Sequence, residues 1–127
     1  MIAKADEKGI YDETHVAKIE DFLNAAERAH YDLVFAADVF VYVGDLAPIF
    51  AHIAKVLAAG GLLAFTVETH AGDGAKLLPT LRFAHGENHL RQMLNAAGLA
   101  APHLAKTSVR SEKGVPVEGL VVVASAA

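Results

Sequence analysis

Asp38 and Tyr42 are the first residues whose type and position suggest chemistry. Both follow Leu33–Ala37, an apolar run that predicts a buried strand. Open α/β sheets bind ligands at the carboxyl ends of their strands. A carboxylate at such a place can orient or deprotonate a substrate. The alternative interpretation is that Asp38 only caps the turn after the strand.

Two histidines fall in the segment 69–86, which follows a second apolar run. An imidazole titrates near neutral pH, so His70 and His85 are candidate general bases, and the alternative for each is a solvated loop side chain. His85 and His89 also stand four residues apart, as zinc ligands on a helix can. However, Gly86 is expected to cap the following helix and to leave His85 outside it, so no metal site is predicted.

The elements that position these residues alternate along the chain. Apolar spacing and turn residues predict a helix end, a short strand, a helix, a strand, a helix stopped by Gly60-Gly61, a strand, a long loop, a helix and two strands. In order, these elements are 1–8, His15–Ile19, Glu20–Ala29, Leu33–Ala37, 45–59, Leu62–Glu68, 69–86, Glu87–Ala97, Leu104–Arg110 and Val117–Ala124.

This alternation predicts an α/β fold, with a mostly parallel sheet and helices on both faces. The turn residues 111–114 join the last two strands into a C-terminal antiparallel hairpin. Residues Val34–Phe35 and Leu62–Phe65 are expected in the core, because runs that are apolar on both sides are typical of strands buried between two layers.

Composition limits the classes of function. The chain has 127 residues, which predicts a single domain over 1–127, and 54% of them are hydrophobic. The net charge is -4 without a run of Lys or Arg, so neither nucleic acid nor an anionic membrane is expected as a partner. There are no cysteines, and residues 1–8 are unlike a signal peptide, so a cytoplasmic protein is expected.

Three segments together resemble the class I S-adenosylmethionine-dependent methyltransferases. Residues Tyr31–Leu46 resemble the fourth strand of that family and its following loop. Residues Val56–Glu68 resemble the turn into the fifth strand, with Ala59 in place of the usual proline, and 82–99 resemble a later helix. The nearest subgroup is the predicted methyltransferases that often carry upstream tetratricopeptide repeats.

The resemblance implies a partial Rossmann-like fold whose strands run in the order third, second, first, fourth, fifth, seventh, sixth. The first two strands are missing from residues 1–127, and in the family they carry the glycine-rich turn and the acidic residue that hold S-adenosylmethionine. The remaining cofactor contacts would come from Lys18, Ile19, Ala37, Asp38 and Val39. Lys18 stands where the family usually has an aspartate that accepts from the adenine amino group, and a lysine can only donate.

The function implied is methyl transfer to an unknown acceptor, with candidate catalytic residues Asp38, Tyr42, His70 and His85. The alternative is an inactive, truncated domain that serves as an oligomerising or binding module. A nicotinamide-binding Rossmann protein fits less well, because of the reversed terminal hairpin. Without the first strand, the edge of Leu33–Ala37 lacks a neighbour, which predicts a two-fold homodimer through this edge and the first 30 residues.

Overall fold

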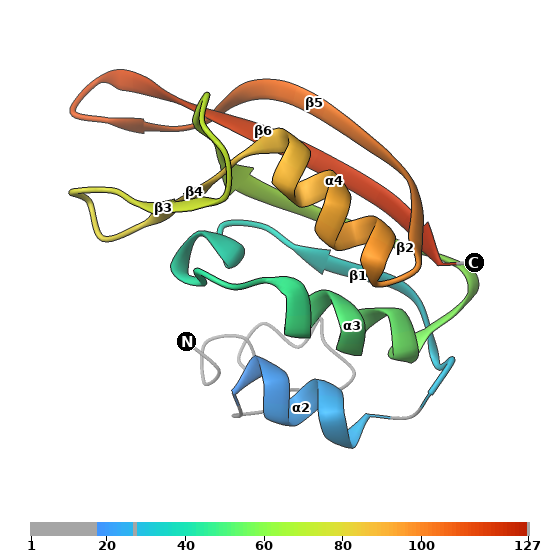
Figure 1. Ribbon diagram of the computed structural model, residues 1–127. Helices are drawn as coiled ribbons and strands as arrows, with labels where there is room; N and C mark the ends of the chain where they lie inside the picture. The colour runs from blue at the N-terminus through green and yellow to red at the C-terminus, as the bar shows by residue number, and fades with distance from the viewer. Residues whose placement is uncertain (1–17, 27, 127) are drawn as a thin grey trace.

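The computed structural model describes residues 18–126 except residue 27, and Figure 1 shows the arrangement of its helices and strands. The elements are α2 (Ile19–Ala25), β1 (Tyr31–Ala36), the 3-10 helix η1 (Phe40–Tyr42), α3 (Ala47–Val56), β2 (Leu57–Glu68), β3 (Ala75–Leu77), β4 (Phe83–His85), α4 (Glu87–Ala96), β5 (Leu99–Glu112) and β6 (Val115–Ala126). In this part of the chain, no helix is long and apolar enough to cross a membrane.

Strand β2 is the centre of the described sheet. It pairs in parallel with β1 and antiparallel with β6, and both partners pair with residues 62–65, so they lie on opposite edges of β2. Strand β4 pairs in parallel with the end of β2 at Glu68, and β5 pairs antiparallel with β6. The order β1-β2-β6-β5 is the predicted order fourth, fifth, seventh, sixth, which is therefore confirmed for these strands.

The hairpin between β5 and β6 has a two-residue turn. Glu112 pairs with Val115, and the turn residues Lys113 and Gly114 have φ angles of 50° and 79°. Two successive positive φ values define the turn type whose twist matches that of paired strands. The predicted hairpin is confirmed, and its strands extend beyond the predicted ranges at both ends.

Alternate residues of the central strands face the helices. Leu63, Phe65 and Val67 of β2 are buried, and they pack with apolar residues of α3 and α4 in one core cluster. The rings of Phe40, Phe50 and Phe65 meet at centroid distances of 5.2–6.1 Å. The described helices therefore cover this face of the sheet and make the core.

The other face of the sheet is open at its apolar residues. Leu33 and Phe35 of β1 are 57% and 68% exposed, and Leu62 of β2 is 43% exposed. Leu33 pairs with Leu62, so these side chains share one face. The prediction that Phe35 and Leu62 are core residues is wrong, because within the described residues the helices contact only their neighbours on the opposite face.

The boundary between α3 and β2 lies earlier than the glycine pair predicted. The amides of Ala29 and His30 donate to the carbonyls of Lys55 and Val56, at 2.9 and 2.8 Å. This contact ends α3 at Val56. Gly60 then bends β2 with a φ of 75°. A tertiary hydrogen-bond pair therefore overrides the local stop signal of Gly60-Gly61.

The elements around the sheet also differ in part from prediction. Ile19 begins helix α2, so the end of the predicted strand His15–Ile19 is wrong, and the rest of that strand lies outside the described residues. Helix α2 ends at Ala25 rather than Ala29. The predicted loop 69–86 contains the short β3–β4 hairpin. Helix α4 confirms its prediction, with Leu90, Met93 and Leu94 buried and Gly98 after its end at a φ of 82°.

Candidate active site

Asp38 lies two residues after β1 in a left-handed backbone conformation. Its φ is 55°, a region that few residues with a side chain adopt and that Asp and Asn adopt most readily. Its amide donates to the Thr66 hydroxyl on β2 at 3.0 Å, and its carboxylate accepts from the Arg82 guanidinium. Strain held by specific contacts is a common feature of functional sites. The predicted strand-end position of Asp38 is therefore also a fixed position.

Arg82, which precedes β4, connects the ends of three elements. Its Nε donates to Glu68 at the end of β2, its Nη1 donates to the Tyr42 hydroxyl at 2.8 Å, and its Nη2 donates to Asp38. The guanidinium also lies 5.0 Å from the centroid of the Tyr42 ring. Burial lowers the pKa of Arg82, but hydrogen bonds with Glu68 and Asp38 outweigh it and raise that pKa. The guanidinium is therefore charged.

Glu68 joins this cluster to the C-terminal hairpin. Its side chain is 1% exposed, and its two oxygens accept from Nε and Nη2 of Arg110 at 3.1 and 3.4 Å. Arg110 also donates to Glu112, and its hydrogen bonds with the two carboxylates raise its pKa. We call Asp38, Tyr42, Glu68, Arg82, Arg110 and Glu112 the strand-end cluster. Its buried carboxylate is compensated by two guanidinium groups.

The candidate base His70 is tied into its own loop. The Gly72 amide donates to Nδ1 at 3.1 Å, so that nitrogen carries no proton. Nε2 lies 2.9 Å from the Gly74 carbonyl and must therefore be the nitrogen that carries the hydrogen. No described hydrogen bond connects His70 with the strand-end cluster. The structure places it as a loop-ordering residue on the neighbouring segment.

The candidate base His85 is fully buried in β4. Within the described residues, neither of its ring nitrogens makes a hydrogen bond of good geometry, although backbone groups of Phe40 and Val43 lie near the ring. Burial lowers its pKa and outweighs these backbone groups, which would raise it, so the neutral imidazole is the form that the fold accommodates. His85 lies outside helix α4, as predicted, and the described residues contain no group of three or more side chains suited to bind a metal ion.

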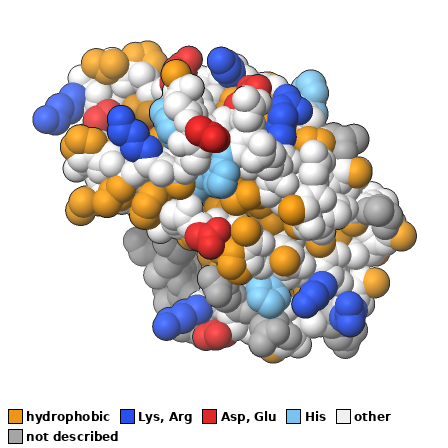
Figure 2. All heavy atoms as spheres, in the orientation of Figure 1, with side chains coloured by type: hydrophobic (Ala, Val, Ile, Leu, Met, Phe, Trp, Pro, Cys, Tyr) orange, Lys and Arg blue, Asp and Glu red, His pale blue; other side chains and the backbone are white. Residues whose placement is uncertain are grey.

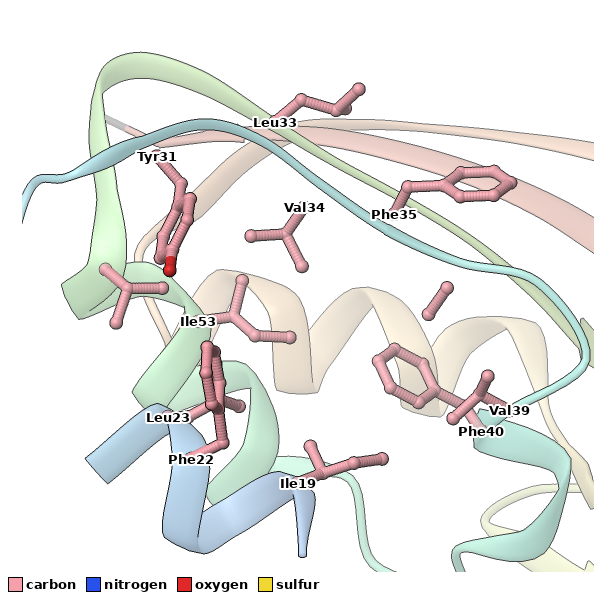
Figure 3. A pocket seen from close by; sticks show the side chains of 12 residues that line it. Ile19, Phe22, Leu23, Tyr31, Leu33, Val34, Phe35, Val39, Phe40 and Ile53 are labelled. Atoms are coloured by element: carbon pink, nitrogen blue, oxygen red, sulfur yellow. The ribbon is translucent and has the colours of Figure 1, made fainter. Parts of the chain in front are cut away.

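A groove of about 410 Å³ lies beside β1, on its side away from β2, and Figure 3 shows side chains of α2 facing β1 and α3 across it. Its lining includes two predicted cofactor contacts, Ile19 and Val39. Two further predicted cofactor contacts, Lys18 and Ala37, are exposed and do not line the groove. The lining residues are Ile19, Phe22, Leu23, Tyr31, Leu33, Val34, Phe35, Ala36, Val39, Phe40, Ile53 and Val56.

Residues 1–65 match a family model described as methyltransferase domain. The chain therefore belongs to the methyltransferase domain family. No curated protein sequence matches it. Solved structures of methyltransferases share its fold at 15–20% sequence identity.

Three of these structures are similar over nearly all of this chain. One is the Burkholderia thailandensis 1,6-didemethyltoxoflavin-N1-methyltransferase, solved with bound 1,6-didemethyltoxoflavin and S-adenosylhomocysteine. Its TM-score is 0.73 at 16% sequence identity, and the match covers 98% of this chain and 55% of that protein. The CurJ carbon methyltransferase has a TM-score of 0.70 at 20% sequence identity, and the match covers 99% of this chain and 39% of that protein. A Methanosarcina mazei methyltransferase has a TM-score of 0.67 at 15% sequence identity, and the match covers 98% of this chain and 76% of that protein. The chain thus spans between two fifths and three quarters of the length of these proteins.

The methyltransferase cofactor fits the described groove only in part. The apolar lining suits a flat ring such as adenine. The Tyr31 hydroxyl is the one polar side-chain group among the lining residues, whereas the ribose hydroxyls and the charged amino-acid end of S-adenosylmethionine need several partners. The side chains that line this groove therefore do not supply all the polar contacts that the cofactor needs.

The candidate catalytic residues named from the sequence did not include Glu68, Arg82 or Arg110, although Glu68 and Arg82 fall after the same strands or in the same loop as the residues that were named. Glu68 carried a signal, because a carboxylate at the end of an apolar strand needs a cation if the strand is buried. The same reasoning points to Arg82, because it is a cation in the segment 69–86 that follows Glu68. Arg110 carried no signal, since its strand is otherwise mixed in character.

Proposed function

We propose that this methyltransferase chain supplies the acceptor side of the reaction, with Asp38 and Tyr42 facing the acceptor and with Arg82 and Glu68 positioning them. The observation that carries the proposal is the strand-end cluster at the carboxyl ends of β1 and β2. That is where open α/β sheets bind their ligands. The methyl acceptor is a small molecule or a protein side chain.

The expected role of Asp38 follows from its two oxygens. One accepts from Arg82, while the side chain as a whole is 64% exposed. The second oxygen can accept a hydrogen bond, or a proton, from an incoming nucleophile. Because methyl transfer depends mainly on alignment, the larger contribution is expected from the fixed geometry of this carboxylate.

A transfer assay with S-adenosylmethionine labelled in its methyl group tests this proposal. The protein is incubated with several millimolar cofactor and a panel of amines, phenols and thiols, and labelled product is counted. Asp38→Asn should reduce transfer by at least about ten-fold, a typical effect of losing one acid or base. Asp32→Asn, at the other end of β1, is the matched control and should retain transfer. Equal activity of the two variants would contradict the role of Asp38.

A second candidate function is that of an oligomerising module, as a two-fold homodimer through β1. Among the described strands, β1 pairs only with β2, so its other edge offers unpaired backbone groups beside the apolar groove. The exposed Leu33 and Phe35 add apolar surface next to that edge. Such an edge is a template for a further strand, and a second copy supplies one symmetrically.

Light scattering at micromolar concentration tests the dimer. Ala36→Lys places a charge on the β1 edge strand and should shift the protein toward monomer. Ala105→Lys places the same charge on an exposed site of β5, at the far edge of the sheet, and should leave the dimer intact. Circular dichroism confirms that both variants are folded. A native protein that is monomeric under these conditions would refute the dimer.

A further inference from the structure

The strand-end cluster has a net charge of minus one. It holds three carboxylates and two guanidinium groups, and both guanidinium groups donate to carboxylates within it. The Arg82 side chain is only 11% exposed, and each of its three nitrogens donates to an oxygen of the protein. The charges of both guanidinium groups are therefore already paired with carboxylates within the cluster.

The hydrogen-bonding capacity left in the cluster favours a ligand that donates. Asp38 uses Oδ1 for Arg82, and among the described residues no hydrogen bond reaches its Oδ2. The Tyr42 hydroxyl oxygen accepts from Arg82, and its second lone pair can accept one further hydrogen bond. An ammonium group can donate to this oxygen and to Asp38 Oδ2, and its positive charge is opposite to that of the Asp38 carboxylate.

Exposed apolar side chains lie on the hairpin that carries Arg82. Tyr42 is 60% exposed, with Arg82 over its ring, and Leu81 and Leu77 of the β3–β4 hairpin are 75% and 55% exposed. Hydrophobic side chains gather over this hairpin in Figure 2. Leu81 precedes Arg82 in the chain, so the turn that carries this apolar surface also carries a residue of the cluster.

Leu81 is exposed and also has a backbone conformation that is unfavourable for leucine, which indicates a role beyond closing the turn. Its φ is 65°, which is costly for a branched side chain, and the turn is closed by hydrogen bonds of 2.9 Å from Leu81 to Leu78 and 2.8 Å from Leu78 to Arg82. A solvent-facing turn with no other role would favour Gly or Asn at such a position. Here a large apolar residue is both strained and exposed, directly before Arg82 in the chain.

We propose that the acceptor is an apolar molecule that carries a basic amine, held by Asp38 Oδ2 at the amine and by Tyr42, Leu77 and Leu81 along its apolar body. The inference rests on the proposed function only for its assumption that the acceptor binds at Asp38. It adds the chemical class of the ligand, and it expects amines to bind better than carboxylates and phosphates at this site.

Nuclear magnetic resonance titrations with three small probes test the ligand class without cofactor or methyl transfer. Phenethylamine carries an apolar body and an ammonium group, 3-phenylpropionate carries the same body and a carboxylate, and ethanolamine carries the ammonium group without the body. Phenethylamine should shift the Leu81 methyl, Tyr42 ring and Asp38 amide signals more than either of the others at equal concentration. Equal or larger shifts with 3-phenylpropionate, or no localised shifts with any probe, would overturn the proposal.

Two variants separate the charge from the apolar contact. Asp38→Asn should weaken phenethylamine binding by about ten-fold, as expected for losing a charged hydrogen bond, while the control Asp32→Asn should not change it. Leu81→Asn removes the apolar contact but tolerates the positive φ, so the fold is retained and binding should fall. Unchanged binding in both test variants would overturn the site. Asp38-dependent methyl transfer to an anionic acceptor would retain the proposed function and refute the amine class alone.

Discussion

Replacing Glu68 with Gln tests the buried part of the strand-end cluster. The Glu68 side chain is 1% exposed and accepts hydrogen bonds from Arg82 and Arg110. Removing one partner of a buried ion pair costs about 3–5 kcal/mol, and the long contact of 3.4 Å favours the lower end of that range. With a urea dependence of about 2 kcal/mol per M, a loss of about 3 kcal/mol lowers the unfolding midpoint by about 1.5 M.

The matched control for this experiment is Glu112→Gln. Glu112 also pairs with Arg110, but its side chain is 44% exposed, so water screens the interaction. Its urea midpoint should change by less than about 0.5 M, as for other surface ion pairs. Midpoints that fall equally in the two variants would refute the claim that Glu68 is a buried charge compensated from two sides.

Two further stability predictions concern His85 and the terminal turn. Because burial lowers the pKa of His85 in the folded protein, the unfolded chain takes up a proton there first as the pH falls below its usual value of 6.5. The contribution of His85 to stability is thus fully present above pH 6.5 and is lost below it, by up to about 1.4 kcal/mol per pH unit. Between pH 7 and pH 5, urea unfolding should therefore show a smaller loss of stability for His85→Leu than for the native protein. An equal loss would count against the buried neutral imidazole. Lys113→Asn should raise the free energy of unfolding by about 0.5 kcal/mol, because Asn-Gly suits the observed turn better than Lys-Gly, and a decrease would show that the turn has another conformation.

Periodicity in the sequence was sufficient to predict an element whose buried face and end are both set by its own residues. In Glu87–Ala96, apolar residues at helical spacing and a following glycine predicted both the buried face and the end of the helix, and both are confirmed. The strand order came from the family resemblance rather than from periodicity, and it is confirmed for β1, β2, β6 and β5.

Long-range contacts limited the rest of the prediction. The end of α3 depends on a hydrogen bond to Val56 from His30, which no local signal near Gly60 reports. The runs around Phe35 and Leu62 are apolar on both sides, so the sequence alone did not distinguish the helix-covered face from the open face. Periodicity describes each strand, whereas exposure depends on what packs against it.

The candidate site shows the same limit. The position of Asp38 after its strand was predicted, but its partner Arg82 is 44 residues away, and Arg110 lies 42 residues from Glu68. The histidines stood out because an imidazole can act as a base at neutral pH. The structure instead engages His70 within its loop and buries His85. Residue type made both histidines candidates, whereas reach and burial decide whether a base can act, and the sequence does not report these.

Isothermal titration with S-adenosylhomocysteine tests the central claim most directly, namely that this methyltransferase chain presents an acceptor-side cluster beside an incomplete cofactor groove. The described groove has a single polar side-chain group, the Tyr31 hydroxyl. Each missing hydrogen bond to a buried polar group costs about 1–3 kcal/mol. We therefore expect binding no tighter than roughly millimolar, a free energy of about 4 kcal/mol. A dissociation constant in the low micromolar range would contradict this account.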